Sequence, residues 1–417
     1  MLAPRNIEGQ MPRKLLGIGI IGAGGIVRRH AVAYRCLPEL ARLVAVADVD
    51  KDRANAAKRE HGFAEIYTDY RELLGRDNID VVSICTPPHL HSRMVIEALD
   101  AGKHVLCEKP IARTLEEADQ EIAAAERQAQ LKASCVYQYR SDPTHKRVRQ
   151  MIHSNSLGRI LMATVRVRAK RMPGYYAAAP GRGSRRIDGG GVLINQAIHQ
   201  LDALVSFLGS PVEASAIMQT FLQPTEGEDT LAGWIKFENG AFATIDCTVC
   251  AHDEWFAIEV IGENAQTTVR GTTDRHDCTW KVASKSSAVE RALRMSGLSD
   301  FPDLPAGLPP WRVKAQKAVH KVRGRQWLPP WYWGHTPHVR DFLNSIGSLD
   351  PPPVPPREAR RSLELANGLY ISALTRKAVQ FPIERDHIFY SGIPSERRIN
   401  STETSRGSTF RSSVVPA

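Results

Sequence analysis

A glycine-rich turn directly after an apolar run is the feature that most constrains the fold of this chain. Residues 15–21 form an apolar run of strand length, and GAGGIV at residues 22–27 leads into a helical pattern. The first glycine permits a tight turn, and the second lets a pyrophosphate approach the backbone beside the N–H groups that begin the helix. The sequence therefore predicts a dinucleotide-binding turn, whose expected cofactor-binding residues are Gly22, Gly24, Gly25 and Ile26.

Residues near this turn refine the prediction. The third position of the motif is Val27, where glycine or alanine is usual, so the packing of helix on strand must accommodate a branched side chain. The next predicted strand, residues 43–47, ends in Asp48. A carboxylate there accepts hydrogen bonds from a ribose 2′-hydroxyl and repels a 2′-phosphate, which favours NAD over NADP. Lys51 and Arg53 leave NADP open, and Asp48 would equally serve as the N-cap of the following helix.

Strands and helices alternate through the first third of the chain. Apolar runs of strand length recur at residues 79–85, 104–107 and 132–136, and helical patterns separate them at residues 89–100 and 115–130. Strands that alternate with helices of this length are typical of βαβ units. The pattern therefore predicts a doubly wound parallel sheet, which is an α/β Rossmann fold.

Two of these strands end in residues suited to binding a ligand. Ligands of an open parallel sheet bind just past the carboxyl ends of its strands. One run ends in Thr86, Pro87 and His89, and the next ends in Glu108 and Lys109. A lone lysine after a strand is more often a plain surface residue, so its assignment depends on the surrounding motifs. We expect all five residues to contact the cofactor.

The second half of the chain has the pattern of an α+β domain. After an alternating run at residues 159–170, hairpin signals such as ENG at residues 238–240 separate several further strand-like runs. They predict a large, mostly antiparallel sheet with helices on one face. The further runs are residues 212–219, 230–237, 241–248, 255–261 and 266–271.

Residues 191–208 have the pattern of one amphipathic helix. An apolar stripe at helical spacing predicts its buried face, formed by Ile194, Ile198, Leu201, Val205 and Leu208. A second stripe is polar and contains Asn195, His199 and Asp202. Polar groups on such a helix need partners, and a single histidine there is more often structural than catalytic.

An irregular loop rich in Gly, Arg and Tyr precedes this helix. It contains Tyr175, Tyr176 and Arg182, side chains that bind polyols or anionic groups. A solvated connector is an equally good interpretation of the loop. We expect these three residues to bind the substrate.

These patterns divide the chain into two domains with extensions. We expect residues 1–14 to be an N-terminal extension, residues 15–140 to be the NAD-binding Rossmann domain, and residues 141–383 to be the C-terminal, substrate-binding domain. Within the latter, residues 273–334 form a basic insertion rich in Trp and Pro. Residues 384–417 carry little apolar content and predict a disordered tail.

The motifs together resemble one family. TPPHLHSRMVIEALDAGKHVLCEKPIA at residues 86–112 closely resembles the Gfo/Idh/MocA oxidoreductases, and GIGIIGAGGIVRRH, YRSDP and GGGVLINQAIHQLDAL support the resemblance. HTPHVRDFLNSI and RRSLELANGLYISALTRKAV fit it as well. The resemblance covers roughly residues 14–272 and 335–383, and the combination of motifs is far more specific than any one of them.

The resemblance implies an enzyme, an NAD(P)-dependent oxidoreductase. It would transfer a hydride between nicotinamide and a hydroxyl-bearing carbon of a sugar, sugar derivative or cyclitol. Lys109 would hydrogen-bond the reacting oxygen and His199 would remove its proton. Many relatives carry Asp four residues before this histidine. This chain has Asn195, which cannot accept a proton at neutral pH and would orient the substrate, while Asp202 would orient His199. The resemblance thus implies that Asn195 and Asp202 also bind the substrate.

Two other functions remain open within the same fold. One is an NAD-dependent, redox-neutral glycosidase, which would keep NAD bound and release no net NADH. The other is a non-catalytic NAD(P)-binding sensor, against which the presence of both Lys109 and His199 argues. The resemblance also implies a homo-oligomer that pairs through the open face of the C-terminal sheet.

Charge and cysteine content bound the partners and the compartment. The net charge is +10, and residues 273–334 hold eleven Lys and Arg against five Asp and Glu, with five of the seven tryptophans. Such a segment binds nucleic acid, covers a phosphorylated or nucleotide-linked sugar or, most commonly, packs as a peripheral insertion; nucleic acid is the least expected. Seven scattered cysteines fit the cytoplasm, and no apolar run predicts a membrane span. Cys247 and Cys250 lie in a strand-like run and point to opposite faces, so we expect no metal.

Overall fold

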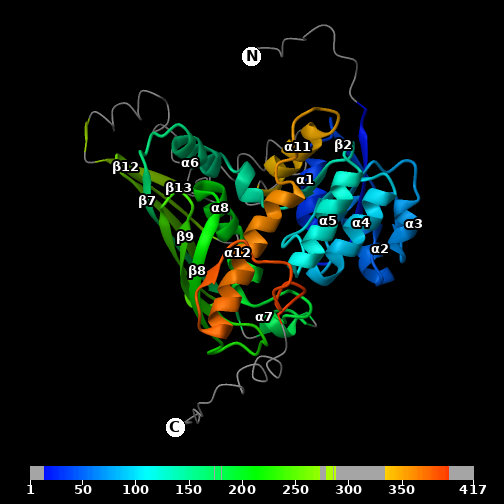
Figure 1. Cartoon of the computed structure of the whole chain (residues 1–417). Coiled ribbons are helices and arrows are strands. Elements are labelled where there is room, and N and C mark those ends of the chain that lie inside the picture. Colours follow the sequence, from blue (N-terminus) through cyan, green and yellow to red (C-terminus); the bar gives the residue numbers. More distant parts are fainter. Residues whose placement is uncertain are drawn as a thin grey trace, which may run out of the picture.

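The computed structural model describes residues 14–172, 174–179, 181–272, 279–284, 286–287 and 334–393. In this part of the chain the strands form two sheets (Figure 1). The first sheet has the order β3-β2-β1-β4-β5-β6, and all of its strand pairs are parallel. Its strands are β1 (Leu16–Ile21), β2 (Ala41–Ala47), β3 (Glu65–Tyr67), β4 (Val81–Ile84), β5 (His104–Cys107) and β6 (Ala133–Cys135).

This order confirms the doubly wound fold. The chain moves outward from β1 to β3 and then crosses back to β4, so the switch point lies between the carboxyl ends of β1 and β4. Every residue of β1 is buried, as expected of a central strand covered on both faces. The helices that cover the sheet are α1 (Val27–Arg35), α2 (Lys51–His61), α3 (Tyr70–Leu74), α4 (His91–Asp100) and α5 (Leu115–Arg127).

The second sheet is mostly antiparallel, as predicted. Its order is β13-β12-β11-β7-β10-β9-β8-β14, and β7 and β10 form its parallel pair. The strands are β7 (Ile160–Lys170), β8 (Pro211–Gln219), β9 (Thr230–Phe237), β10 (Phe242–Thr248), β11 (Cys250–Gly262), β12 (Ala265–Gly271), β13 (Thr279–Ser284) and β14 (Val379–Gln380). β13 lies within the predicted insertion and pairs with β12 at the edge of the sheet. Most of residues 273–334 lie outside the described residues.

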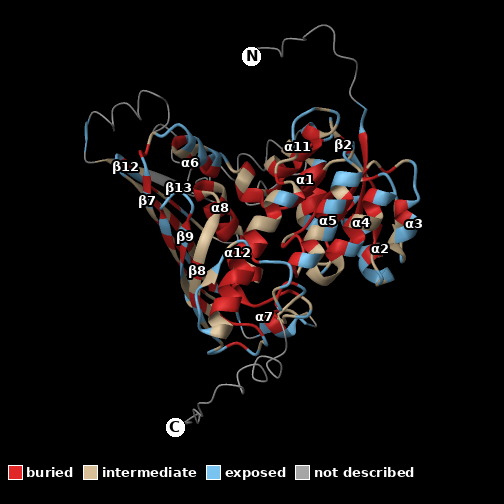
Figure 2. Cartoon of the chain, viewed as in Figure 1, coloured by how far each residue is buried: buried red, intermediate tan, exposed pale blue. Residues whose placement is uncertain are grey.

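Helices cover one face of the second sheet (Figure 1). They include α6 (Pro143–His153), α8 (Ile198–Leu208) and α12 (Pro356–Thr375), and short helical segments connect them. The long α12 packs against β8 and α8 and also against α5 of the first domain. It therefore fixes the two halves of the molecule to each other. Its residues 362–372 are all buried, as Figure 2 shows, because α12 lies between the sheet, α8 and α5.

Helix α11 (His335–Ser345) packs on α1, although the predicted boundaries place it in the C-terminal domain. Its Val339, Phe342 and Leu343 belong to the apolar cluster that contains Ile18 and Tyr34. The late segment of the chain therefore completes the core of the first domain. A division of the sequence into consecutive ranges cannot assign a late helix to the first domain.

The beginning of the predicted disordered tail is packed in the structure. Phe389 is 2% and Tyr390 5% exposed, and the Tyr390 hydroxyl contacts Asp119 on α5 and Arg360 on α12. The mean composition of residues 384–417 is poor in apolar residues, but these two aromatic residues are enough to pack the first part of the segment. Residues 394–417 lie outside the described residues.

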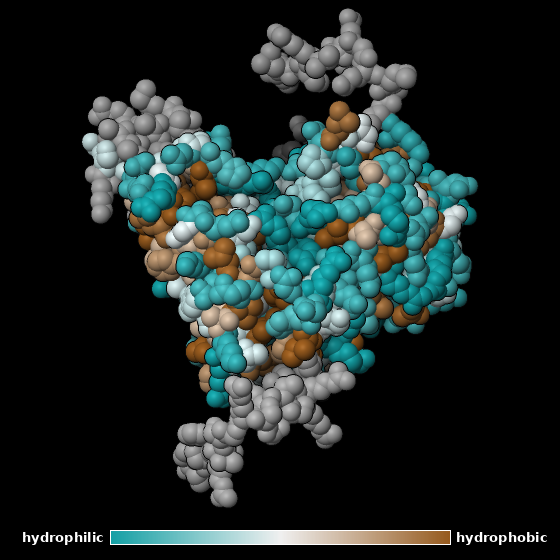
Figure 3. Space-filling view, viewed as in Figure 1, coloured by the Kyte–Doolittle hydropathy of each residue, from teal (hydrophilic) through white to brown (hydrophobic). Residues whose placement is uncertain are grey.

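In the view of Figure 3, apolar residues gather mainly over the half that holds the second sheet. None of the described helices is long and apolar enough to cross a membrane.

Candidate functional site

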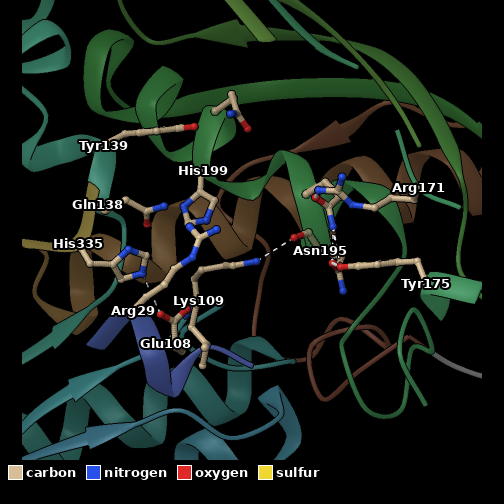
Figure 4. Close-up of a pocket in the computed structure, with 13 residues that line it drawn as sticks. Arg29, Glu108, Lys109, Gln138, Tyr139, Arg171, Tyr175, Asn195, His199 and His335 are labelled. Atoms are coloured by element: carbon tan, nitrogen blue, oxygen red, sulfur yellow. Dashed lines mark hydrogen bonds and ion pairs between the residues drawn. The ribbon is translucent and has the colours of Figure 1, made fainter. Parts of the chain in front are cut away.

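A cavity of about 410 Å³ lies where the carboxyl edge of the first sheet meets α8 (Figure 4). Six of the residues singled out from the sequence line it: Ile26, Glu108, Lys109, Tyr175, Asn195 and His199. Seven further lining residues were not predicted: Arg29, Gln138, Tyr139, Arg171, Gln196, Gln200 and His335. Segments far apart in the sequence therefore form one site.

The glycine turn after β1 fits the pyrophosphate of a dinucleotide. Gly22 has φ +98°, and a Cβ added to it would lie 2.6 Å from the Cys85 carbonyl oxygen, so only glycine fits there. Around Gly24 and Gly25, by contrast, no heavy atom of the described residues lies within 4 Å of an added Cβ. No described side chain caps α1, and its first turn holds no acidic residue. The turn thus offers space and backbone N–H groups to an anion.

The valine at the third motif position is accommodated in the core. Val27 is 5% exposed and belongs to the apolar cluster that contains Ile18 of β1. The departure from the usual motif therefore leaves the packing of α1 on the sheet intact.

Asp48 braces the same turn. Its Oδ2 accepts a hydrogen bond from the Ala23 N–H (2.7 Å), and its Oδ1 accepts one from the Asp50 N–H (2.9 Å). The N-cap of α2 is Asp50, which accepts from the backbone of Asp52 and Arg53, so the interpretation of Asp48 as that cap is wrong. The carboxylate of Asp48 instead lies beside the glycine turn, at the carboxyl end of β2.

The residues that follow β4 lie outside the cavity. The Thr86 N lies 3.1 Å from the Cβ position of Gly22, so Thr86 and Pro87 adjoin the glycine turn. His89 lies farther along, where its backbone N–H donates to the Ile187 carbonyl and its side chain lines a second cavity, between α4 and α5. Burial lowers the pKa of His89. Contacts of these residues with the cofactor remain a prediction.

Lys109 spans the cavity from the end of β5. Its Nζ donates a hydrogen bond to the backbone carbonyl of Asn195 at 2.8 Å, drawn as a dashed line in Figure 4. Burial lowers the pKa of Lys109, and the nearby carboxylates of Glu108 and Asp188 oppose that shift. The ammonium group is thus held at a fixed place between the two domains.

Glu108 pairs with two histidines from other elements. Its Oε1 lies 2.8 Å from Nε2 of His30 on α1 and 3.5 Å from Nε2 of His335 on α11. Burial alone would raise the pKa of Glu108, but these hydrogen bonds hold it well below its usual range. The three side chains have the composition of a cation site, with ligand atoms within 4.8 Å of one another. The carboxylate–imidazole contacts already account for them, and they tie α1, β5 and α11 together.

The predicted single helix consists of two parts. Leu193–Ala197 form a π-helical turn, and the regular helix α8 begins at Ile198. The predicted apolar stripe is buried along its whole length. A Cβ on Gly191 would lie 1.9 Å from the Glu228 carbonyl oxygen, and the Glu228 carboxylate accepts from the N–H groups of Gly191 and Leu193. Glu228 therefore holds the start of the segment that carries Asn195, and π-turns are frequent at functional sites.

His199 lies on the first turn of α8 and lines the cavity. The rings of Tyr137 and Tyr139 approach it edge-on, with centroids 6.0 Å and 5.6 Å away. Tyr139 in turn stacks on His145 at 4.7 Å. Two rigid aromatic neighbours thus fix the imidazole at the wall opposite Lys109.

Asp202 lies outside the cavity, which corrects the expectation that it binds substrate or orients His199. It is fully buried, and its two oxygens accept from Nη2 and Nε of Arg140, both at 2.8 Å. The Ser362 hydroxyl donates to Oδ1 at 2.7 Å. A buried carboxylate needs a paired cation, and Arg140 of the segment Gln138–Ser141 supplies it.

The loop residues differ in their positions. Tyr175 lines the cavity, and its hydroxyl donates to Oδ1 of Asn195 at 2.9 Å. The Arg182 guanidinium lies 4.5 Å from the centre of the Tyr175 ring and donates to the Tyr175 carbonyl, so it supports Tyr175 from outside the cavity. Tyr176 is 4% exposed and belongs to the core. The geometry therefore does not favour direct contact of Tyr176 or Arg182 with the substrate.

Some of the unpredicted lining residues had a sequence signal. Arg29 belongs to the first turn after the glycine motif, Tyr139 to YRSDP, and His335 to HTPHVRDFLNSI. Position within a recognised motif would have found these three. Gln196 had the same signal, since it lies within GGGVLINQAIHQLDAL. Arg171 had none, because only the fold brings it to the cavity, where it donates to Gln196 Oε1 at 2.7 Å and pairs with Glu254.

Two family models match the chain. An oxidoreductase family with an NAD-binding Rossmann fold matches residues 16–135, and the GFO/IDH/MocA C-terminal domain matches residues 145–268. The chain belongs to the GFO/IDH/MocA oxidoreductase family. It is an NAD-dependent oxidoreductase, and the glycine turn and Asp48 lie in its NAD-binding domain.

The matches to individual relatives extend over at least two thirds of each relative's own length. The D-glucoside 3-dehydrogenase of Escherichia coli is 30% identical over 257 residues, which are 58% of this chain and 72% of that protein. The 1,5-anhydro-D-fructose reductase of Ensifer adhaerens is 33% identical over 228 residues, 54% and 67% of the two chains. The WlbA dehydrogenase of Bordetella pertussis, solved with NADH and UDP-GlcNAcA, has a TM-score of 0.72 at 25% identity and covers 89% of this chain and 100% of that one.

Proposed function

We propose that this enzyme transfers a hydride between NAD and a ring hydroxyl carbon of a sugar or sugar derivative. The observation that carries the proposal is that Lys109 and His199, from different domains, line one cavity beside the glycine turn. Its relatives D-glucoside 3-dehydrogenase and 1,5-anhydro-D-fructose reductase support a sugar-like substrate, as does the sugar nucleotide bound to WlbA.

The residues of the cavity divide the chemistry between them. When bound, NAD supplies the hydride acceptor for the carbon that bears the hydroxyl. His199 takes the hydroxyl proton, and Lys109 donates a hydrogen bond to the same oxygen and stabilises its developing negative charge. Asn195 orients the sugar through its side-chain carbonyl. In the direction of reduction the same groups return the proton.

A turnover screen tests the proposal. The purified protein is incubated with NAD and a panel of pyranoses, glycosides, cyclitols and nucleotide-linked sugars, and formation of NADH is followed by absorbance. We expect NADH with at least one sugar. Glycoside cleavage without net NADH would instead indicate the redox-neutral glycosidase, and binding of NAD and a sugar without any turnover would indicate the sensor.

Cofactor preference gives a prediction at Asp48. Asp48→Ser should weaken NAD binding and narrow its advantage over NADP, because it removes both the 2′-hydroxyl acceptor and the brace on the Ala23 N–H. Titration of both cofactors by fluorescence measures the two affinities. Asp50→Ser is the matched control, since it removes a neighbouring charge but keeps a good N-cap. Tighter binding of NADP than of NAD to the unmodified protein would contradict the assignment.

We also propose that the open face of the second sheet pairs with a second copy of the chain. Ile217, Trp234 and Phe242 lie on the face opposite the helices and are 75%, 40% and 47% exposed. Large apolar side chains grouped on one face favour a subunit interface. Trp234→Glu should lower the molecular mass found by sedimentation, whereas Leu349→Glu, at an exposed site after α11, should not. A monomeric unmodified protein would refute the pairing.

A further inference from the structure

Asp188 is a buried carboxylate behind the cavity that the proposed chemistry does not use. It is 8% exposed and lies just before the glycine run that leads into the π-turn. Its Oδ2 accepts hydrogen bonds from the backbone N–H of Gly183 at 2.8 Å and from Nδ2 of Asn195 at 3.0 Å. Asp188 does not line the cavity itself, so it can affect the substrate only through its neighbours. These are Asn195, which it hydrogen-bonds, and Lys109, whose pKa its charge helps to keep up.

An ionised carboxylate only accepts hydrogen bonds, so the group of Asn195 that faces Asp188 must be the amide NH₂. The Oδ1 atom of Asn195 therefore points the other way, where it accepts from the Tyr175 hydroxyl at 2.9 Å and from Nε2 of Gln196 at 2.7 Å. Gln196 also donates to the Tyr175 hydroxyl at 2.9 Å. The carboxylate sets the orientation of the Asn195 amide, and Arg171, which donates to Gln196 Oε1 at 2.7 Å, sets that of the Gln196 amide.

We propose that Asp188 is a positioning residue that locks the Asn195 amide with its carbonyl oxygen toward Tyr175 and the cavity. This inference rests on the proposed function, because it assigns to Asn195 Oδ1 the task of accepting a substrate hydroxyl. A substrate hydroxyl would take the place of one of the two donors that Oδ1 has in the free protein. Without the lock the amide can turn over and present its NH₂ group, which repels the hydroxyl proton.

The lock also predicts that aspartate is unsuited to position 195 in this protein. Asn195→Asp would bring a second carboxylate to about 3.0 Å from Oδ2 of Asp188. Two carboxylates at that distance cannot both ionise without mutual repulsion. An amide opposite a carboxylate avoids this repulsion, so adding Asp188→Asn should relieve the charge conflict that Asn195→Asp introduces. The relief should be partial, because Oδ2 of Asp188 also accepts from the Gly183 N–H, which would then face an amide NH₂ group.

The test is a cycle of four proteins: unmodified, Asn195→Asp, Asp188→Asn, and both changes together. Asn195→Asp should lower the Tm by about 2–4 °C, the shift expected for a modest loss of stability in a domain of about 150–250 residues, and the added Asp188→Asn should recover part of it. The Tm needs no substrate, so failure of this cycle is distinguishable from failure of the proposed function. An Asn195→Asp protein as stable as the unmodified one, or one that Asp188→Asn does not rescue, would overturn the lock.

Kinetics with the sugar found in the screen supply the second readout. Asp188→Leu keeps the volume but removes the acceptor, and should lower kcat/KM by about 10–100-fold, as for the outer partners of metal ligands. Asp188→Asn keeps an acceptor oxygen and should recover most of this loss. NAD affinity should not change, because the hydrogen-bond partners of the Asp188 carboxylate are Gly183 and Asn195 and include neither the glycine turn nor Asp48. A folded Asp188→Leu protein with unchanged kcat/KM would refute the positioning role, and if that variant does not fold, the exchange cycle decides.

Discussion

Replacement of Lys109 or His199 by alanine is expected to lower turnover by about 10²–10⁴-fold while NAD still binds. Both side chains line one cavity, and the proposed mechanism requires both at a single oxygen atom. Their combined loss should therefore be smaller than the product of the single losses, because the two groups serve one transition state. Steady-state kinetics with the sugar found in the screen measure the cycle, and a fluorescence titration measures NAD binding.

The chain offers a matched control for the lysine. Lys103, just before the other end of β5, is also buried and donates to backbone carbonyls, those of Arg76 at 2.8 Å and Ile79 at 3.0 Å. Lys103→Ala should cost stability but leave kcat unchanged, since that lysine lies far from the carboxyl edge of the sheet. Full activity of His199→Ala would contradict the mechanism and leave Tyr175, which lines the same cavity, as the next candidate acid/base.

Loss of Arg140 is expected to give the largest change in stability. Arg140→Ala would leave the fully buried Asp202 without its cation, and such a change typically costs about 3–5 kcal/mol. The pair fixes α8 to the segment Gln138–Ser141, so the walls of the cavity that carry His199 and Tyr139 should loosen as well. Equilibrium unfolding in urea measures the free energy.

Two further variants distinguish the effect of losing a buried ion pair from the effect of losing a charge as such. Lys146 forms an exposed ion pair with Asp341 at 2.7 Å, and Lys146→Ala should cost no more than about 1 kcal/mol. The combination Arg140→Met and Asp202→Leu should recover much of the loss, because apolar residues avoid the unpaired buried charge. An Arg140→Ala protein as stable as Lys146→Ala would contradict this account, because it would mean that the Ser362 hydroxyl is enough to keep the buried Asp202 carboxylate.

Regular patterns made the fold predictable. The alternation of strands and helices gave the parallel sheet, and the apolar stripe from Ile194 to Leu208 identified the buried face of the helix. These signals are local, because a period of two or of 3.6 residues depends only on neighbours in the chain. The same local patterns, read with the family motifs, brought Lys109, Asn195 and His199 into consideration before any geometry was known.

Long-range contacts account for what the sequence did not reveal. Asp202 belongs to the same polar stripe as His199, yet its carboxylate pairs with Arg140, which is 62 residues away in the sequence. His335 enters the cavity because α11 returns to α1, across an insertion whose pattern gave no hint of that path. The π-turn that directs the Asn195 carbonyl to Lys109 likewise depends on Glu228, which lies in another loop.

A crystal structure of the protein with NADH and its sugar tests the central claim most directly. We expect one substrate oxygen to lie within about 2.6–3.2 Å of both Lys109 Nζ and a ring nitrogen of His199. The carbon that bears this oxygen should face the nicotinamide. A bound sugar whose reacting oxygen reaches only one of the two side chains, or that lies outside this cavity, would contradict the account.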